Sequence, residues 1–292
     1  MNVKLVIFDL DDTLAASKCP IAADMAEMLQ RLLETRYVAV ISGCRWEQFH
    51  RQFVGHVAPR FYPYLIIAPV SGGQVLRWRN EAWQVVHETS IAVSFQQVVD
   101  AFEAAFKAIG FERPTHLWGP VFEDRGSQVT YSGLGQQAPH HEKKNWDPDF
   151  SKRKPLIEAV RLHLPAHLAI RAGGSTSIDV SGYEKDYGIR QLILQVRNHG
   201  ISEDDALFIG DAIFPGGNDY AVTKTSVRYI ETKSLEHTKE LILAILEDEH
   251  ELVSRSRRGV PATPDPLPAA ERQSGQLTLA GFVGSGVSRS HS

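Results

Sequence analysis

The sequence predicts a doubly wound α/β fold, in which helices cover both faces of a mostly parallel sheet. Short apolar runs, typical of buried parallel strands, recur at 3–8, 37–41, 64–68, 206–209 and 226–230. Between them lie segments whose apolar residues are three and four positions apart, which is the spacing of an amphipathic helix. Strand followed by helix, repeated, is the pattern of this fold class.

The middle of the chain has a different pattern. Helices are expected at 95–108 and 154–164, and strands at 127–132, 167–171 and 176–180. Helices and strands that do not alternate regularly make an α+β unit. We therefore expect 82–184 to be a separate domain, inserted into an α/β core that comprises 1–81 and 185–250.

The last part of the chain, 251–292, is rich in Ser, Arg, Gly and Pro and is expected to be a disordered tail. Within it, Gln276, Leu279 and Phe282 have the spacing of a sliding-clamp binding peptide. Chance is the favoured explanation of that match, because short motifs arise easily in segments of low complexity.

Charge and hydropathy exclude several classes of protein. The net charge is −4, and five arginines lie in the tail, so the body of the chain is more acidic still. An acidic body argues against a nucleic-acid partner. No apolar run approaches the roughly 20 residues of a membrane span, and no secretory signal is visible, so we expect a cytoplasmic protein without a membrane partner.

Three carboxylates, Asp9, Asp11 and Asp12, follow the first apolar run in the string FDLDDT. Like charges this close repel, so their placement at a strand end requires a cation or a proton to offset them. Ligands of open α/β folds bind at this end of the strands. We therefore expect a ligand or metal site here, and a solvated acidic turn is the alternative.

A second acidic string, GDAIFPGGND at 210–219, follows the apolar run ALFI. Gly216 and Gly217 permit a tight loop that returns Asp219 toward Asp211. Asp9 and Asp211 together would form an oxygen-rich site for Mg²⁺. Taken alone, this string would more simply be a surface turn.

Two further features complete a phosphate-binding set. Ser42 and Gly43 follow the apolar run VAVI, and Lys185 precedes a predicted helix. A hydroxyl, backbone N–H groups and an ammonium can together hold a phosphoryl group. Each feature is ordinary by itself, and their order along the chain is what gives them weight.

In that order, the four features resemble the four motifs of the haloacid dehalogenase (HAD) superfamily of phosphotransferases. The inserted unit resembles the cap domain of subfamily IIB. The PGGND string and the GGSTSIDV string at 173–180 are similar to those of eukaryotic-type phosphomannomutases. The resemblance covers about residues 3–248 and implies a HAD-type core with an α+β cap.

The resemblance also implies a role for each of these residues. Asp9 would be the nucleophile that accepts the phosphoryl group, and Asp11 the acid and base that acts on the leaving and attacking oxygens. Mg²⁺ would be held by Asp9, Asp211 and the backbone carbonyl of Asp11, with Asp219 in support. The groups that would bind the phosphoryl oxygens are Ser42, Gly43 and Lys185.

The cap departs from the phosphomannomutase pattern at one position. In that family an arginine at each end of one run grips the distal phosphate of the sugar, whereas here the run begins at Arg125 and ends at Gln136. Ser177 and Asp179 complete the substrate contacts that the resemblance implies. Loss of one guanidinium removes a contact typically worth ~1.5–3 kcal/mol.

This departure favours one of two activities and leaves the other open. A mutase must hold a bisphosphate by either end, and a hydrolase need not. Hydrolysis of a small phosphate ester, with a sugar phosphate favoured, is therefore the first expectation, and a phosphohexomutase acting on mannose or glucose phosphates is the alternative. A non-catalytic binding module is a third hypothesis, which the intact motif residues argue against.

One charged segment is expected to have no role in the site. Residues 140–144 (HHEKK) have the composition of a solvated loop. A metal site there would need more ligands nearby.

Overall fold

Seven strands form the sheet of the core, in the spatial order β11-β10-β1-β2-β3-β4-β5. In this computed structural model, which describes residues 3–257, the strands from β11 to β3 pair in parallel. Their bounds are Leu5–Asp9 (β1), Tyr37–Ile41 (β2), Leu65–Ala68 (β3), Ala206–Gly210 (β10) and Arg228–Glu231 (β11). The predicted α/β class, with a mostly parallel sheet, is confirmed.

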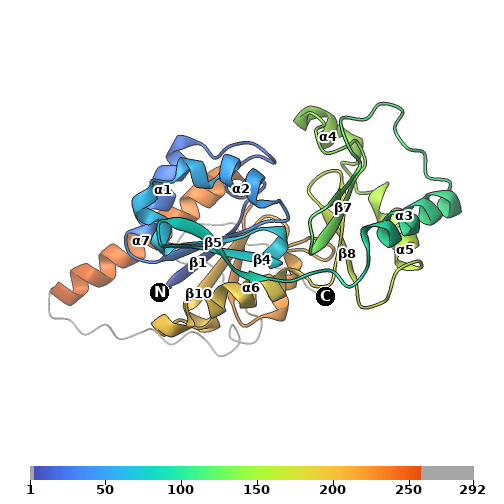
Figure 1. Ribbon diagram of the computed structural model, residues 1–292. Helices are drawn as coiled ribbons and strands as arrows, with labels where there is room; N and C mark the ends of the chain where they lie inside the picture. Colours follow the sequence, from blue (N-terminus) through green and yellow to red (C-terminus); the bar gives the residue numbers. More distant parts are fainter. Residues whose placement is uncertain (1–2, 258–292) are drawn as a thin grey trace.

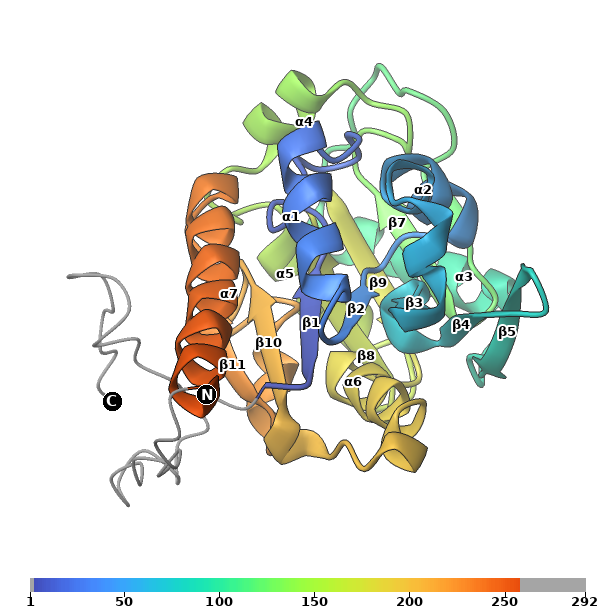
Figure 2. The same cartoon turned by 90° about the vertical axis from the view of Figure 1, so that its left-hand side faces the viewer.

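Alternation of side chains along the strands gives the sheet two buried faces. On one face, residues such as Val6 and Phe8 pack against three helices, of which α1 and α7 lie side by side in Figure 2. On the other face, Leu5 and Ile7 pack against α6. The bounds of these helices are Ala23–Leu33 (α1), Trp46–Gln52 (α2), Lys185–Leu194 (α6) and Leu235–Arg257 (α7).

A hairpin extends the core sheet with two antiparallel strands, β4 (Gln74–Arg79) and β5 (Ala82–Glu88). The turn residues Asn80 and Glu81 have φ of 51° and 59°, as tight hairpin turns require. The expected boundary between core and cap at 82 is therefore displaced. The hairpin completes the edge of the sheet, and the chain leaves the core only after Glu88.

The helix α7 also runs past an expected boundary. It ends at Arg257, whereas the tail was expected to begin at 251, because helix-forming residues such as Leu and Glu continue through 252. The clamp-like residues Gln276, Leu279 and Phe282 lie outside the described residues.

The inserted cap contains a four-stranded antiparallel sheet in the order β6-β7-β9-β8, with α3 and α5 on one face (Figure 1). Alternation again explains the arrangement, because Ile178 and Val180 are buried against these helices while Ser177 and Asp179 face the core. The bounds are Phe95–Ile109 (α3), Phe122–Asp124 (β6), Gln128–Ser132 (β7), His140–Trp146 (α4), Arg153–Arg161 (α5), Ala169–Gly173 (β8) and Ser177–Ser181 (β9).

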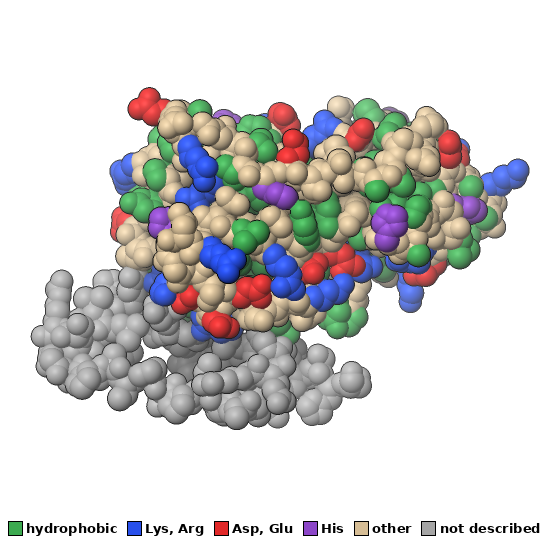
Figure 3. Space-filling view, turned by 60° about the horizontal axis from the view of Figure 1, so that its bottom comes forward, with side chains coloured by type: hydrophobic (Ala, Val, Ile, Leu, Met, Phe, Trp, Pro, Cys, Tyr) green, Lys and Arg blue, Asp and Glu red, His purple; other side chains and the backbone are tan. Residues whose placement is uncertain are grey.

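The surface carries charges of both signs. Among the described residues visible in Figure 3, Lys and Arg side chains are interspersed with Asp and Glu and form no continuous basic patch on that face. Among residues 3–257, no helix has both the length and the apolar character that a membrane span requires.

Candidate active site

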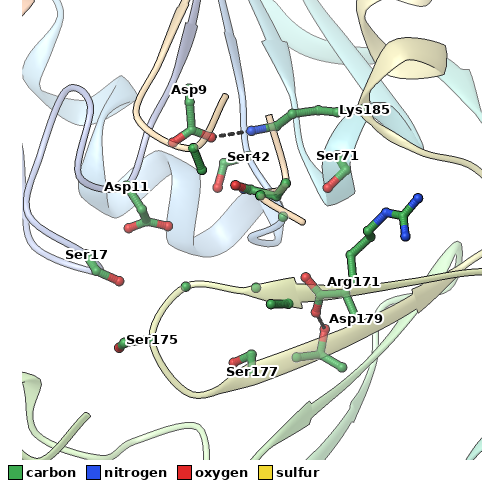
Figure 4. Close-up of a pocket in the computed structure, with 18 of the residues that line it drawn as sticks. Asp9, Asp11, Ser17, Ser42, Ser71, Arg171, Ser175, Ser177, Asp179 and Lys185 are labelled. Carbon is green, nitrogen blue, oxygen red and sulfur yellow. Dashed lines mark hydrogen bonds and ion pairs between the residues drawn. The ribbon is translucent and has the colours of Figure 1, made fainter. Parts of the chain in front are cut away.

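A cavity of about 440 Å³ lies between the carboxyl ends of the core strands and the inner face of the cap sheet. Ligands of open α/β sheets bind at this edge because several strand ends present their side chains together. Figure 4 shows Asp9, Ser42 and Lys185 on the core side of the cavity, opposite Ser177 and Asp179 of the cap.

A lysine lies between two carboxylates at the bottom of this cavity. Lys185 is the first residue of α6, and its ammonium donates hydrogen bonds to Asp9, at the end of β1, and to Asp219. All three side chains are buried. Burial opposes the positive charge, but the charges of Asp219 and Asp9 outweigh it and raise the pKa of Lys185. The site therefore holds a fixed positive charge beside the carboxylate expected to be the nucleophile.

The carboxylates have the chemistry of a magnesium site. Within residues 3–257, one group of acidic side chains brings its ligand atoms within 4.8 Å of one another, and it consists of Asp9, Asp211 and Asp219. Burial raises the pKa of Asp9, and it raises that of Asp211 to about 7, with Asp219 adding to both shifts. A divalent cation would offset this repulsion, and hard oxygen ligands suit Mg²⁺.

Asp219 fits a supporting position in this group. Its Oδ1 accepts from Lys185, and its Oδ2 accepts the N–H of Ala212 at 3.2 Å. Asp211 follows β10 and lines the cavity, where its Oδ1 accepts from Thr13 Oγ1 at 3.3 Å. Asp9 and Asp211 are therefore the side chains best placed to bind the ion directly.

Asp11 lies on the cavity wall, and its carboxylate is outside the acidic group. Its Oδ1 accepts the N–H of Lys18 at 2.7 Å and the side-chain amide of Gln52 at 3.0 Å. These bonds hold the carboxylate on the cavity wall, where it could exchange a proton with a substrate oxygen. The backbone carbonyl remains the group that Asp11 could offer to a metal.

Ser42 and Gly43 follow β2, as expected for phosphoryl-binding groups. Ser42 is buried, and its Oγ accepts the N–H of Cys44 at 3.3 Å. A Cβ placed on Gly43 would lie 3.5 Å from Asp179 Oδ2, so this loop lies close beneath the cap. Asp179 in turn accepts a hydrogen bond from Thr130 at 2.7 Å.

Arg125 reaches across from the cap to the core. Its guanidinium donates to Glu123, with an Nε–Oε2 distance of 2.8 Å, and to the carbonyl of Gly43. Glu123 also pairs with Arg45 of the core at 3.4 Å. The charge of Arg125 is thus already offset by a carboxylate. Gln136 does not line the cavity, and within residues 3–257 its buried side-chain nitrogen has no hydrogen-bond partner.

Two lysines that the motifs did not indicate line the same cavity. Lys18 and Lys143 both donate to the carbonyl of Gln136, at 3.2 and 3.4 Å. Lys143 is buried, and burial together with the charge of Lys18 lowers its pKa to about 8. The expectation of a solvated loop is therefore wrong for Lys143. Its helix, α4, is anchored by Trp146, whose ring lies where a Cβ on Gly133 would be.

The fold is HAD-like. A haloacid dehalogenase-like hydrolase from Bacteroides thetaiotaomicron has a TM-score of 0.55 and 16% identity, over 83% of this chain and 99% of that one. IMP-bound IMP-nucleotidase of Plasmodium falciparum has a TM-score of 0.61 and 14% identity, over 84% of this chain and 68% of that one. The expected HAD-type fold is confirmed.

In sequence, the chain is similar to phosphomannomutases. It is 22% identical over 226 residues to that of Spinacia oleracea, covering 75% of this chain and 85% of that protein. It is 24% identical over 233 residues to that of Dendrobium officinale, covering 75% of this chain and 84% of that protein. No family model matches the chain. Fold and similarity together support a phosphomannomutase-like protein of the HAD superfamily, an enzyme of the phosphatase or phosphomannomutase type.

Proposed function

We propose that the protein is a Mg²⁺-dependent hydrolase of a small phosphate ester, with a sugar phosphate as the substrate class. The observation that carries this proposal is the Lys185 ammonium between Asp9 and Asp219, at the bottom of a cavity that Asp211 also lines. A carboxylate can approach an anionic phosphate only where cations cancel their repulsion.

The residues suggest a two-step reaction. A carboxylate oxygen of Asp9 forms a bond to phosphorus as the bond from phosphorus to the alcohol oxygen breaks, and protonated Asp11 gives its proton to that oxygen. Asp11 then takes a proton from water, whose oxygen bonds to phosphorus and releases Asp9 and inorganic phosphate. Lys185 and the N–H groups near Ser42 and Gly43 offset charge on the phosphoryl oxygens. Bound Mg²⁺ would supply further positive charge.

The contacts of two cap residues favour a hydrolase over a phosphohexomutase. A mutase must grip a second phosphate, and the arginine at the start of the cap run, Arg125, is already engaged by Glu123 and Gly43. The other end of the run is Gln136, which lies outside the cavity lining. Neither end of this run presents an uncompensated guanidinium to the substrate.

One observation favours the alternative, a phosphohexomutase. Lys18 and Lys143 converge on the Gln136 carbonyl and line the cavity. Two ammonium groups could bind a second phosphate, although without the planar, two-point geometry of arginine. The alternative is therefore kept beside the hydrolase.

One assay separates these activities. The protein is incubated with mannose 1-phosphate and Mg²⁺, with and without a hexose bisphosphate activator, and with EDTA as the metal control. Release of inorganic phosphate that EDTA abolishes supports the hydrolase. Activator-dependent formation of the 6-phosphate identifies the mutase instead. Neither product, across a broad panel of phosphate esters, would leave a non-catalytic binding module.

A further inference from the structure

The segment that follows β3 carries two consecutive residues in the left-handed region. Val70 has φ of 52° and Ser71 has φ of 54°. A β-branched residue is strained there, and glycine would adopt this conformation without strain. Strained residues that their surroundings hold in place gather at functional sites. Here the carbonyl of Val70 accepts the hydroxyl of Tyr183 at 2.6 Å, which helps to hold the pair.

The next contacts tie this segment to the phosphoryl-binding elements. The N–H of Ser71 donates to the carbonyl of Ser42 at 2.8 Å. Gly72 lies against Gly188 of α6, so closely that a Cβ on Gly72 would be 2.1 Å from the Cα of Gly188. The loop after β2 and the helix that begins at Lys185 therefore fix the position of Ser71.

The hydroxyl of Ser71 faces the cavity and is available to a ligand. Figure 4 shows Ser71 beside Ser42 and Lys185 at the same edge of the core. Within residues 3–257, no group hydrogen-bonds to Ser71 Oγ, whereas Ser42 Oγ accepts from Cys44. Glycine would form the same turn at a lower cost, so the hydroxyl is what serine adds at this position.

We propose that Ser71 is a substrate-binding residue whose hydroxyl donates a hydrogen bond to the alcohol moiety of the phosphate ester. Ser42, Gly43 and Lys185 already supply groups that would bind the phosphoryl oxygens. An additional hydroxyl beside them would therefore contact the alcohol moiety of the ester. A polyol such as a sugar has oxygens next to the esterified one. This inference rests on the proposed function, because it assumes a phosphate ester in the cavity.

The test measures binding, in the Asp9→Asn background so that no turnover occurs. Dissociation constants for a hexose 1-phosphate and for inorganic phosphate are measured by calorimetry with Mg²⁺ present. Ser71→Ala and Ser71→Gly should each weaken the hexose 1-phosphate about fivefold, the size of one neutral hydrogen bond. In both variants the dissociation constant for inorganic phosphate should stay within about twofold of that of the parent. Glu81→Gly, which changes a left-handed residue of the β4–β5 turn, is the matched control and should bind like the parent.

Three outcomes overturn the role of Ser71. The first is unchanged binding of hexose 1-phosphate by Ser71→Ala, and the second is an equal loss of binding of inorganic phosphate. The third is binding of hexose 1-phosphate that is lost in Ser71→Ala but parent-like in Ser71→Gly, because this would assign the effect to the backbone and not to the hydroxyl. Parallel turnover assays of the unmodified protein separate this inference from the proposed function. Binding of the ester without hydrolysis contradicts the hydrolase alone, and failure to bind any ester contradicts both.

Discussion

The charge balance of the site depends on one residue, Lys185. Its ammonium is buried between Asp9 and Asp219 and donates a hydrogen bond to each. Removing one partner from a buried ionic group typically costs ~3–5 kcal/mol, because the remaining charges are left uncompensated. The same arrangement keeps a cation within reach of an attacking carboxylate, so stability and chemistry depend on the same three groups.

Asp9→Asn tests the role of the nucleophile. The amide has almost the same shape as the carboxylate, so we expect the protein to fold, with an unchanged far-UV circular dichroism spectrum. It cannot form the bond to phosphorus at a comparable rate, so kcat should fall by more than about a hundredfold. Residual activity above that level in a protein free of the parent enzyme would contradict the assigned role.

The pKa of Lys143, lowered to about 8 by burial and by Lys18, predicts a pH dependence. Below pH 8 the side chain is an ammonium that attracts an anionic substrate, and above pH 8 the charge is lost. We therefore expect kcat/KM to fall as the pH rises from 7 to 9.

Substitutions of Lys143 provide the controls for this prediction. Lys143→Arg remains charged over that range and should remove this fall. Lys143→Gln should lower kcat/KM about tenfold at pH 7, the size of one charged hydrogen bond. Lys144→Gln, on the exposed side of the same helix, should behave like the parent. A parent profile that is flat through pH 8 would rule out this role for Lys143.

Sequence alone could indicate only part of the site. Asp9 ends a buried strand, and Ser42 and Asp211 directly follow two others, so their position at the sheet edge could be inferred from hydrophobic patterning. Lys143 could not, because its burial depends on how α4 packs on the cap sheet. Asp12, next to the site residue Asp11, has φ of 59°. The position requires the left-handed region, which aspartate tolerates.

At the scale of elements, the contact between α6 and the segment after β3 determines where two site residues lie. A Cβ on Gly188 would be 2.3 Å from the carbonyl oxygen of Ser71 and 2.7 Å from Ile41 Cδ1. Alanine normally stabilises a helix interior by about 1 kcal/mol relative to glycine. Here the added methyl group requires backbone to move, which costs about 1–3 kcal/mol.

Gly188→Ala should therefore lower the free energy of unfolding, measured by urea denaturation. It should also raise KM, because the shift displaces α6 from the cavity edge. Gly182→Ala is the control, since among residues 3–257 no atom outside its two chain neighbours lies within 4 Å of a Cβ at that position. A more stable Gly188→Ala protein would show that the packing between α6 and Gly72 is looser than the distances indicate.

The elements themselves were predictable to different degrees. The parallel strands were recognisable because they are buried on both sides and hence wholly apolar. The strand β5 was missed, since it lies at the sheet edge with half-buried residues and lacks that signal. The helix α4 is short and polar, and it is fixed by Trp146 against Gly133, a tertiary contact that local patterning does not contain.

At the scale of the molecule, polar contacts join the cap to the core. Arg125 donates across the interface to the carbonyl of Gly43, and Glu123 pairs with Arg45. Loosening this junction should weaken substrate binding more than it slows the chemical steps, since the reacting groups lie in the core.

Arg125→Ala should accordingly raise KM more than it lowers kcat, which steady-state kinetics with the true substrate would measure. Arg113→Ala is a suitable control, because Arg113 also belongs to the cap and pairs with Glu103 at 2.7 Å on its exposed surface. An unchanged KM in Arg125→Ala would remove this residue from the site. The sequence indicated that a cap is inserted, but which of its arginines meets the core depends on how the two domains dock.

The two segments that connect the core with the cap both lie against one core residue, Gly73. Its carbonyl accepts the N–H of Thr89 at 2.8 Å where the chain leaves, and a Cβ there would collide with the hydroxyl of Tyr183 where it returns. The outgoing and incoming segments are thus neighbours, and no core strand is interrupted between them. We therefore predict that segment 90–182 can be exchanged as a unit. Grafting another cap at these two points should transfer substrate preference while the recipient keeps its own reaction chemistry.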